Sequence, residues 1–142
     1  MAKSTILRRW QRVGGDRRRL LVRAALVLAA ASAAVALLPF RRAIRFGSVG
    51  RGRGRAQFRA NEYVWAVETA ARYLPLRTMC IEKGLAVQRL LRRSGSDARL
   101  HYGARHDPET GRLQAHVWVS LDDVIVIGGD DSSRFAEVAT YG

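Results

Sequence analysis

The chain has 142 residues, the length of a single domain, which is enough for a modest hydrophobic core. Its residues are 48% hydrophobic, which excludes a chain that is disordered throughout. One cysteine and three histidines exclude an internal disulfide and supply a structural zinc site poorly, so we expect no metal and no cofactor.

The net charge of +13 is concentrated in the N-terminal part of the chain. Residues 1–59 contain 15 Lys and Arg residues against one acid, Asp16, a net charge of +14, whereas residues 60–142 have a net charge of −1. A basic arm of this kind can bind nucleic acid, anionic lipid or an acidic partner, and the count alone does not choose between them. We predict a basic helical arm with a Gly/Arg linker over residues 1–58 and a core domain over residues 59–142.

A long apolar stretch follows the first arginines. Residues 20–40 are rich in Ala and Leu and are interrupted by Arg23, so they predict a helix from about residue 17 to residue 38, closed by Pro39. The uninterrupted run, residues 24–40, is at the lower limit for crossing a bilayer, and arginines flank both of its ends. A membrane-spanning helix and a helix packed on its own domain or on a partner both stay open. We favour the second, in a reducing cytoplasm, with membrane contact through residues 20–40 as the exception.

The middle of the chain predicts a linker and two helices. Residues 46–58 alternate Gly with Arg and indicate a flexible basic linker. Apolar residues at helical spacing then predict a helix over residues 62–73, capped by Asn61, and another over residues 79–93, capped by Thr78.

After residue 97 the spacing of apolar residues changes from helical to alternating. The pattern predicts strands over residues 99–104, 113–121 and 124–127, joined by turns at residues 106–111 and at Asp122-Asp123. A helical N-terminal half followed by an antiparallel β-meander is an α+β fold.

Cys80 is placed in the first turn of the helix over residues 79–93. Backbone N–H groups there lack helical acceptors and lie at the positive end of the helix dipole, so they favour a thiolate and can stabilise a developing oxyanion. Cys80 is thus a candidate nucleophile. The alternative is a buried cysteine that acts as a small hydrophobic residue.

His116, in the second strand, is the candidate general base and acid. It shares its strand face with Gln114, Trp118 and Ser120, which suits a base shielded from water and equally suits a partly exposed surface residue. His101 and His106 are expected to face solvent.

A Cys–His pair usually has a third group that orients the imidazole. The third strand returns toward His116, and the carboxylates that follow it are Asp130, the first choice for this group, and Asp131, the second. Asp122 and Asp123 fit a solvated turn better.

Several segments together resemble a known family, the lasso peptide maturation protease in its short, split form, a transglutaminase-like B protein without a leader-recognition domain. The resemblance covers most of the chain and is carried by Met79–Gly95, Tyr102–Arg105, Ala115–Val119, Ile127–Gly129 and the apolar stretch that ends in Leu38–Arg42. It implies a transglutaminase/papain-like core, in which a catalytic helix packs on an antiparallel β-meander.

The resemblance also implies an activity and partners. The family is a cysteine protease that removes the leader from a ribosomally made precursor peptide, typically after a leader with threonine at its penultimate position. A separate leader-recognition protein presents the precursor, and an asparagine-synthetase-like cyclase closes the macrolactam. Cys80 matches the family nucleophile and His116 the family base. Nucleic acid is not expected as a partner.

The chain departs from the family pattern at the third position. The family often has an aspartate twelve residues after the histidine, which here is Gly128. Asp130 could reach His116 through a shifted loop, or a backbone carbonyl or water could orient it. Two other functions stay open: a basic nucleic-acid- or membrane-binding module without catalysis, and a transglutaminase-like acyl transferase.

Overall fold

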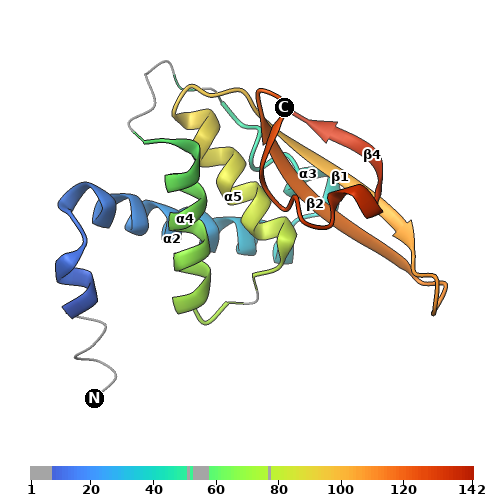
Figure 1. Cartoon of the computed structure of the whole chain (residues 1–142), viewed down its shortest axis with the longest axis horizontal. Helices are drawn as coiled ribbons and strands as arrows, with labels where there is room; N and C mark the ends of the chain where they lie inside the picture. Colours follow the sequence, from blue (N-terminus) through green and yellow to red (C-terminus); the bar gives the residue numbers. More distant parts are fainter. Residues whose placement is uncertain (1–7, 51, 53–57, 77) are drawn as a thin grey trace.

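The computed structural model describes residues 8–50, 52, 58–76 and 78–142. Helices form one layer of the molecule and an antiparallel sheet forms the other (Figure 1). Residues 8–12 form an N-terminal helical segment. The helices that follow are α2 (Gly15–Leu37), α3 (Phe40–Ala43), α4 (Ala60–Tyr73) and α5 (Cys80–Arg93), and α4 and α5 lie side by side across α2. A helical half followed by a sheet confirms the predicted α+β fold.

The sheet of the described residues has four strands in the order β3-β2-β1-β4, with every neighbouring pair antiparallel. β1 (Ala98–His106), β2 (Leu113–Leu121) and β3 (Val124–Ile127) form the predicted meander. A 3₁₀ turn, η1 (Ser132–Arg134), and a strand that was not predicted, β4 (Ala136–Tyr141), complete the sheet beside β1. Most side chains of β4 are exposed, so its sequence lacks the alternation that reveals a half-buried strand.

One hydrophobic cluster joins α2 to α4, α5 and the sheet. A stripe of α2 residues spaced three or four apart belongs to it, together with Leu85 and Leu90 of α5 and Leu100 and Val119 of the sheet. The stripe is Leu20, Leu21, Ala24, Leu28 and Ala31. α2 therefore packs on its own domain, although by length and composition it is also a helix that could cross a membrane. The domain boundary at residues 58/59 stays a prediction, but the core itself continues across it.

The helix starts differ in detail from the prediction. The N-caps are Arg59 and Met79, in place of Asn61 and Thr78, and in each case the backbone N–H of the cap donates to a Glu carboxylate three residues later, Glu62 or Glu82. A Glu that reaches back to the cap satisfies one of the free N–H groups of a first turn, whichever side chain the cap itself carries.

Part of the predicted linker packs on α5. The Arg89 guanidinium donates to the carbonyl of Phe46 and stacks on its ring, and the N–H of Gly52 donates to the carbonyl of Arg92. Residues 51 and 53–57 lie outside the described residues. The described start of the linker is therefore held by specific contacts.

Gly84 determines how closely α5 approaches the sheet. A Cβ at this position would lie 2.9 Å from Cγ1 of Val117 and 3.4 Å from Cδ1 of Leu100, so the absence of a side chain permits the contact. Val117 is β-branched, which limits its ability to move aside.

We expect Gly84→Ala to lower the free energy of unfolding, because overpacking costs about 1–3 kcal/mol and exceeds the gain in helix propensity of about 1 kcal/mol. The loss should disappear in a Val117→Ala background, giving a coupling energy of about 1 kcal/mol or more in a double-mutant cycle measured by urea denaturation. Gly15→Ala, at the start of α2 with nothing within 4 Å of the added carbon, is the control and should be neutral or stabilising. Additive effects of the Gly84 and Val117 substitutions would contradict the role assigned to this contact.

Candidate functional site

Cys80 is the first residue of α5 and is partly buried against the core. The N–H groups of the first turn have no acceptor within the helix, and the Glu82 carboxylate accepts the preceding one, from Met79, at 3.0 Å. Cys80 itself carries one of the remaining N–H groups of this turn, and Ile81 carries the next. A carbonyl carbon attacked by this sulfur would therefore place its oxygen near backbone N–H groups.

His116 is half-buried in β2, where it pairs with Gly103 of β1. Its Nε2–H donates to the carbonyl oxygen of Gly128 at 2.7 Å, and its ring lies 5.1 Å from that of Phe135. Because a carbonyl can only accept, the neutral imidazole carries its proton on Nε2 and leaves Nδ1 as the basic nitrogen.

Cys80 and His116 lie on adjoining elements but on opposite faces of β2. Cys80 is one helical turn before Gly84, on the α5 face that packs on Val117, the neighbour of His116. Along a strand, consecutive side chains point to opposite faces, so the imidazole lies on the Trp118 and Phe135 side. Within the described residues the two groups share no hydrogen bond. In the described structure α5 packs on β2, but the thiol and the imidazole are not in contact.

Gly128 explains why a carboxylate is missing twelve residues after His116. Its φ is +79°, in the left-handed region, and a Cβ there would lie 2.5 Å from the carbonyl oxygen of Val117. An aspartate would not fit this turn without moving the backbone. β3 pairs with β2 from Val119 onward, and the Gly128 turn lies at the β2 edge beyond that pairing, where its carbonyl accepts the imidazole.

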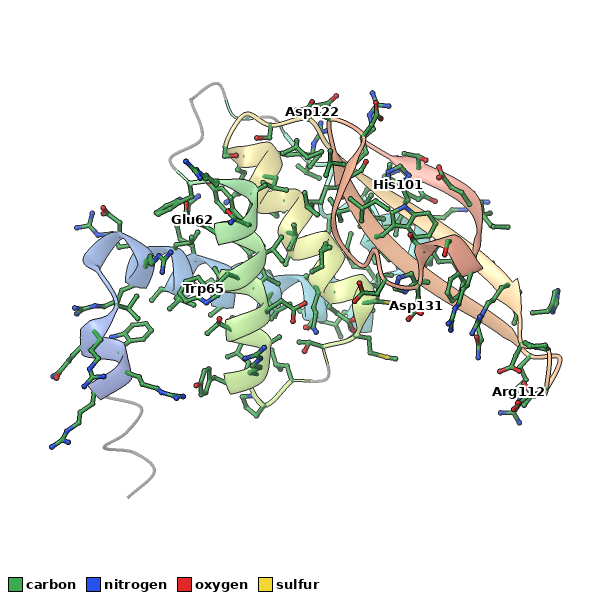
Figure 2. All side chains as sticks on the ribbon, viewed as in Figure 1. Glu62, Trp65, His101, Arg112, Asp122 and Asp131 are labelled. Carbon is green, nitrogen blue, oxygen red and sulfur yellow. The ribbon has the colours of Figure 1, made fainter. Side chains whose placement is uncertain are left out.

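The carboxylates proposed from the sequence are exposed and are not bonded to His116 in the described structure. Asp131 lies 3.7 Å from Arg134, on the loop after β3, and Figure 2 shows it at the opposite end of the β2–β3 hairpin from Asp122. Asp130 has no hydrogen bond or ion pair among the described residues. The backbone carbonyl, one of the two alternatives considered above, orients the imidazole in this conformation.

His101 does not face solvent as predicted: its side chain is 16% exposed, because it packs on Trp118 and bonds to side chains of β2 and β4. Its Nε2 lies 2.7 Å from the Ser120 hydroxyl, its Nδ1 lies 3.2 Å from the Glu137 carboxylate, and its ring stacks on Trp118 (Figure 2). The order Ser–His–Glu resembles a hydrolase relay. Ser120, however, is 8% exposed and is paired on both sides, with Arg99 and Ile125, so its backbone N–H groups are not arranged as an oxyanion hole. The network ties β4 to β1 and β2.

Sequence comparison places these features in a family. Residues 19–140 match the family described as the Transglutaminase-like superfamily. The chain belongs to this superfamily. No curated protein and no solved structure matches the chain. The transglutaminase-like superfamily includes cysteine proteases and acyltransferases, which agrees with a chemistry based on the single cysteine.

Sequence reasoning missed the Gly128 carbonyl as the specific partner of His116, and it missed the His101 network entirely. The first was detectable in part, since a glycine next to another glycine after a strand predicts a turn with an unusual backbone. The second depends on β4, and nothing in its six residues marks a strand strongly. Transglutaminase-like motifs alone do not reveal such contacts.

We expect Gly128→Ala to destabilise the protein by more than the cost of about 1–2 kcal/mol for a left-handed alanine, because the new methyl group also meets the Val117 carbonyl. Gly111→Ala is the matched control: Gly111 has a φ of +67° but nothing within 4 Å of an added carbon, so the backbone cost alone should appear. Urea denaturation of both variants measures the difference. Equal losses would show that the Gly128 turn can relax and that its packing is not required.

The pKa of Glu137 lies below that of an ordinary glutamate, first because the Thr140 hydroxyl donates to the carboxylate and second because His101 does. A carboxyl with a lowered folded-state pKa stabilises the fold above its unfolded-state value, and this contribution is lost as the pH falls through the lower value. We expect Thr140→Val to raise the pKa of Glu137, measured by NMR titration of its carboxyl carbon, and to shift acid loosening of β4 to higher pH. An unchanged titration would contradict the contact.

Proposed function

We propose that this transglutaminase-like chain is a cysteine endopeptidase that removes the leader from a lasso peptide precursor. The observation that carries the proposal is the position of Cys80: it is the first residue of α5, one turn from the contact that packs α5 on the strand of His116. The motif resemblance around both residues supports the precursor as substrate. A separate leader-recognition protein and an asparagine-synthetase-like cyclase are the proposed partners.

The proposed reaction has two stages. The Cys80 thiolate attacks the carbonyl carbon of the leader–core bond, and N–H groups of the α5 start hold the oxyanion. When the tetrahedral intermediate collapses, the carbon–nitrogen bond breaks and the imidazolium of His116 donates its proton to the departing amine of the core peptide. The leader is left as a thioester on Cys80.

Water completes the cycle. Neutral His116 takes a proton from water, the resulting hydroxide attacks the thioester, and the carbon–sulfur bond breaks to give a leader carboxylic acid and free Cys80. The core peptide, with its new N-terminus, is the chemical form that a macrolactam cyclase requires, since the ring forms on that amine.

The mechanism requires a movement of His116. In the conformation described here the imidazole is held by Gly128 beside Phe135, and the thiol lies across β2. Consecutive strand side chains alternate between faces, so a change of rotamer alone leaves the ring on the Phe135 side. The part of β2 before the β3 pairing must turn over to bring the ring toward α5. Hydrogen bonds of catalytic groups commonly shorten when substrate binds, which makes the precursor itself a reasonable trigger.

Cys80→Ala should abolish leader removal, and His116→Ala should lower its rate by about 10²–10⁴-fold, the usual contribution of general acid–base catalysis. The assay is mass spectrometry of precursor incubated with this protein and the leader-recognition partner. His106→Ala is the matched control, because His106 is exposed at the end of β1 and its replacement should leave the rate unchanged. Processing by the Cys80→Ala protein would refute the proposal.

The same assay separates hydrolysis from acyl transfer. In ¹⁸O-labelled water a protease adds one labelled oxygen to the released leader acid, whereas an acyl transferase joins the acyl group to an added amine and releases no labelled acid. Full processing of a precursor whose penultimate leader threonine is replaced by alanine would count against lasso-type cleavage specificity while leaving cysteine chemistry intact.

A further inference from the structure

α2 has two apolar faces, and the fold uses one of them. The inner face carries the core stripe, whereas Val22, Leu26 and Leu37 on the outer face are 47%, 66% and 81% exposed. Exposed alanines, Ala30 and Ala33, continue the outer face between them, and Leu38 and Phe40 extend it past the end of the helix. A continuous exposed apolar strip of this length is unusual for a monomeric soluble surface.

The inner face prevents α2 from crossing a bilayer while the domain stays folded. Leu20, Ala24, Leu28 and Ala31 are at most 1% exposed and belong to the same cluster as Leu85 and Leu100. Each buried leucine contributes about 1.5–3 kcal/mol, so extraction of the helix would remove a large part of the folding energy. The outer face of α2 can therefore contact a partner or a membrane surface while its inner face stays packed in the core.

Arginines stand at both ends of the strip. Arg19 precedes it, Arg23 lies directly after its first residue, and Arg41 and Arg42 follow it; all four are exposed and make no ion pair within the described residues. Arg17, by contrast, is paired with Glu62 and stacked on Trp65. Unpaired guanidinium groups that flank an apolar strip are complementary to a surface with anionic headgroups around an apolar interior.

An apolar cleft adjoins the strip through Val22. Its volume is about 690 Å³, and it lies between residues 9–13, α2 and α4. Trp10, Trp65 and Tyr73 line it, with Arg9 at its wall. Tryptophan and tyrosine favour the boundary between headgroups and acyl chains, because their rings are apolar and their N–H or O–H groups are polar. Figure 2 shows Trp65 on the side of α4 that faces α2 and the N-terminal helical segment.

We propose that the outer face of α2 and this cleft bind the surface of an anionic lipid bilayer, with α2 parallel to the membrane plane. Arginine side chains contact headgroup phosphates, and Val22, Leu26, Leu37 and Phe40 enter the outer part of the acyl layer. The binding is peripheral and reversible. It is independent of the peptidase activity proposed above and stands on different residues.

A nucleic acid or protein partner fits these observations less well. Nucleic acid would use the arginines but would leave the apolar strip uncovered, and base stacking requires aromatic rings along the charged face rather than leucine and alanine. A protein partner could cover the strip but would need acidic groups at both ends of it, a requirement that a bilayer of anionic lipid meets everywhere on its surface.

The test is flotation of the full chain with vesicles of phosphatidylcholine alone and of phosphatidylcholine mixed equally with phosphatidylglycerol. We expect binding to the anionic vesicles, weak binding to the neutral ones, and release as salt is raised, since charge screening shortens to about 3 Å at 1 M. Spin-labelled lipids should quench the fluorescence of Trp10 and Trp65 more when the label is near the headgroups than when it is at the bilayer centre.

Variants test whether vesicle binding depends on the apolar strip of α2 or on exposed hydrophobic residues in general. Leu26→Glu with Leu37→Glu should weaken binding at least about tenfold, since a carboxylate placed in the acyl layer costs more than the roughly 1.4 kcal/mol that one tenfold step requires. Val138→Glu, at a 63% exposed apolar residue of β4, is the control and should bind as the unmodified chain does. Arg41→Gln with Arg42→Gln should lower affinity for anionic vesicles only.

Three results would overturn the proposal: no binding to anionic vesicles at low salt, equal loss in the Val138→Glu control, or quenching strongest at the bilayer centre, which would indicate a spanning helix. RNA binding or self-association that survives Leu26→Glu with Leu37→Glu, in the absence of vesicle binding, would assign the arginines to another partner. The quenching measurement uses the unmodified chain, so the test does not depend on how the variants fold.

Discussion

The contact between Gly84 of α5 and Val117 of β2 sets the geometry of the whole site. Cys80, Gly84 and Gln88 follow one another at intervals of four residues and therefore share one face of α5. At the far end of this face the Gln88 amide donates to the carbonyl of Tyr141 at 2.8 Å, in β4. The helix that carries the thiol is thus registered against β2 by close packing and against β4 by a hydrogen bond. Both contacts must hold for the thiol to keep its position relative to the sheet.

At the Gly128 turn a main-chain carbonyl orients His116, in place of a side-chain carboxylate. A carbonyl oxygen fixes the tautomer of the imidazole as a carboxylate does, but it carries a partial charge and stabilises an imidazolium less. A thiolate nucleophile lessens this disadvantage, because its own negative charge favours a protonated partner, which a neutral serine hydroxyl does not. In chemical terms, a cysteine enzyme tolerates this substitution better than a serine enzyme would.

The accuracy of the sequence-based predictions followed the strength of the local signal. The α2 and α5 helices and the first three strands carry long, regular patterns of apolar residues, and their existence and type could be predicted. β4 lies at the sheet edge with exposed side chains and carries no such pattern. The caps were misassigned because Glu62 and Glu82 act on the backbone of the preceding residues, so the identity of the cap side chain matters little.

In the candidate site, too, the features with a local sequence pattern could be predicted and the others could not. Cys80 and His116 stand in recognisable motifs, whereas the hydrogen bond to Gly128 depends on a left-handed turn and on the register of β3, which are three-dimensional properties. The His101 network needs two strands and a turn that are distant in the sequence to meet on one face. The pattern of apolar residues within one segment cannot predict contacts between segments that are distant in the sequence.

The dual-faced α2 helix has a consequence for the order in which the protein folds. Its core partners Leu85 and Leu100 follow its last residue by more than forty residues, so α2 leaves the ribosome well before anything can cover its inner stripe. During that interval the nascent chain presents a helix that is apolar all round and flanked by arginines. Contacts between residues this far apart form late and slow the folding of a domain. Until α5 and the sheet are complete, the inner stripe of α2 is therefore open to a lipid surface or a chaperone.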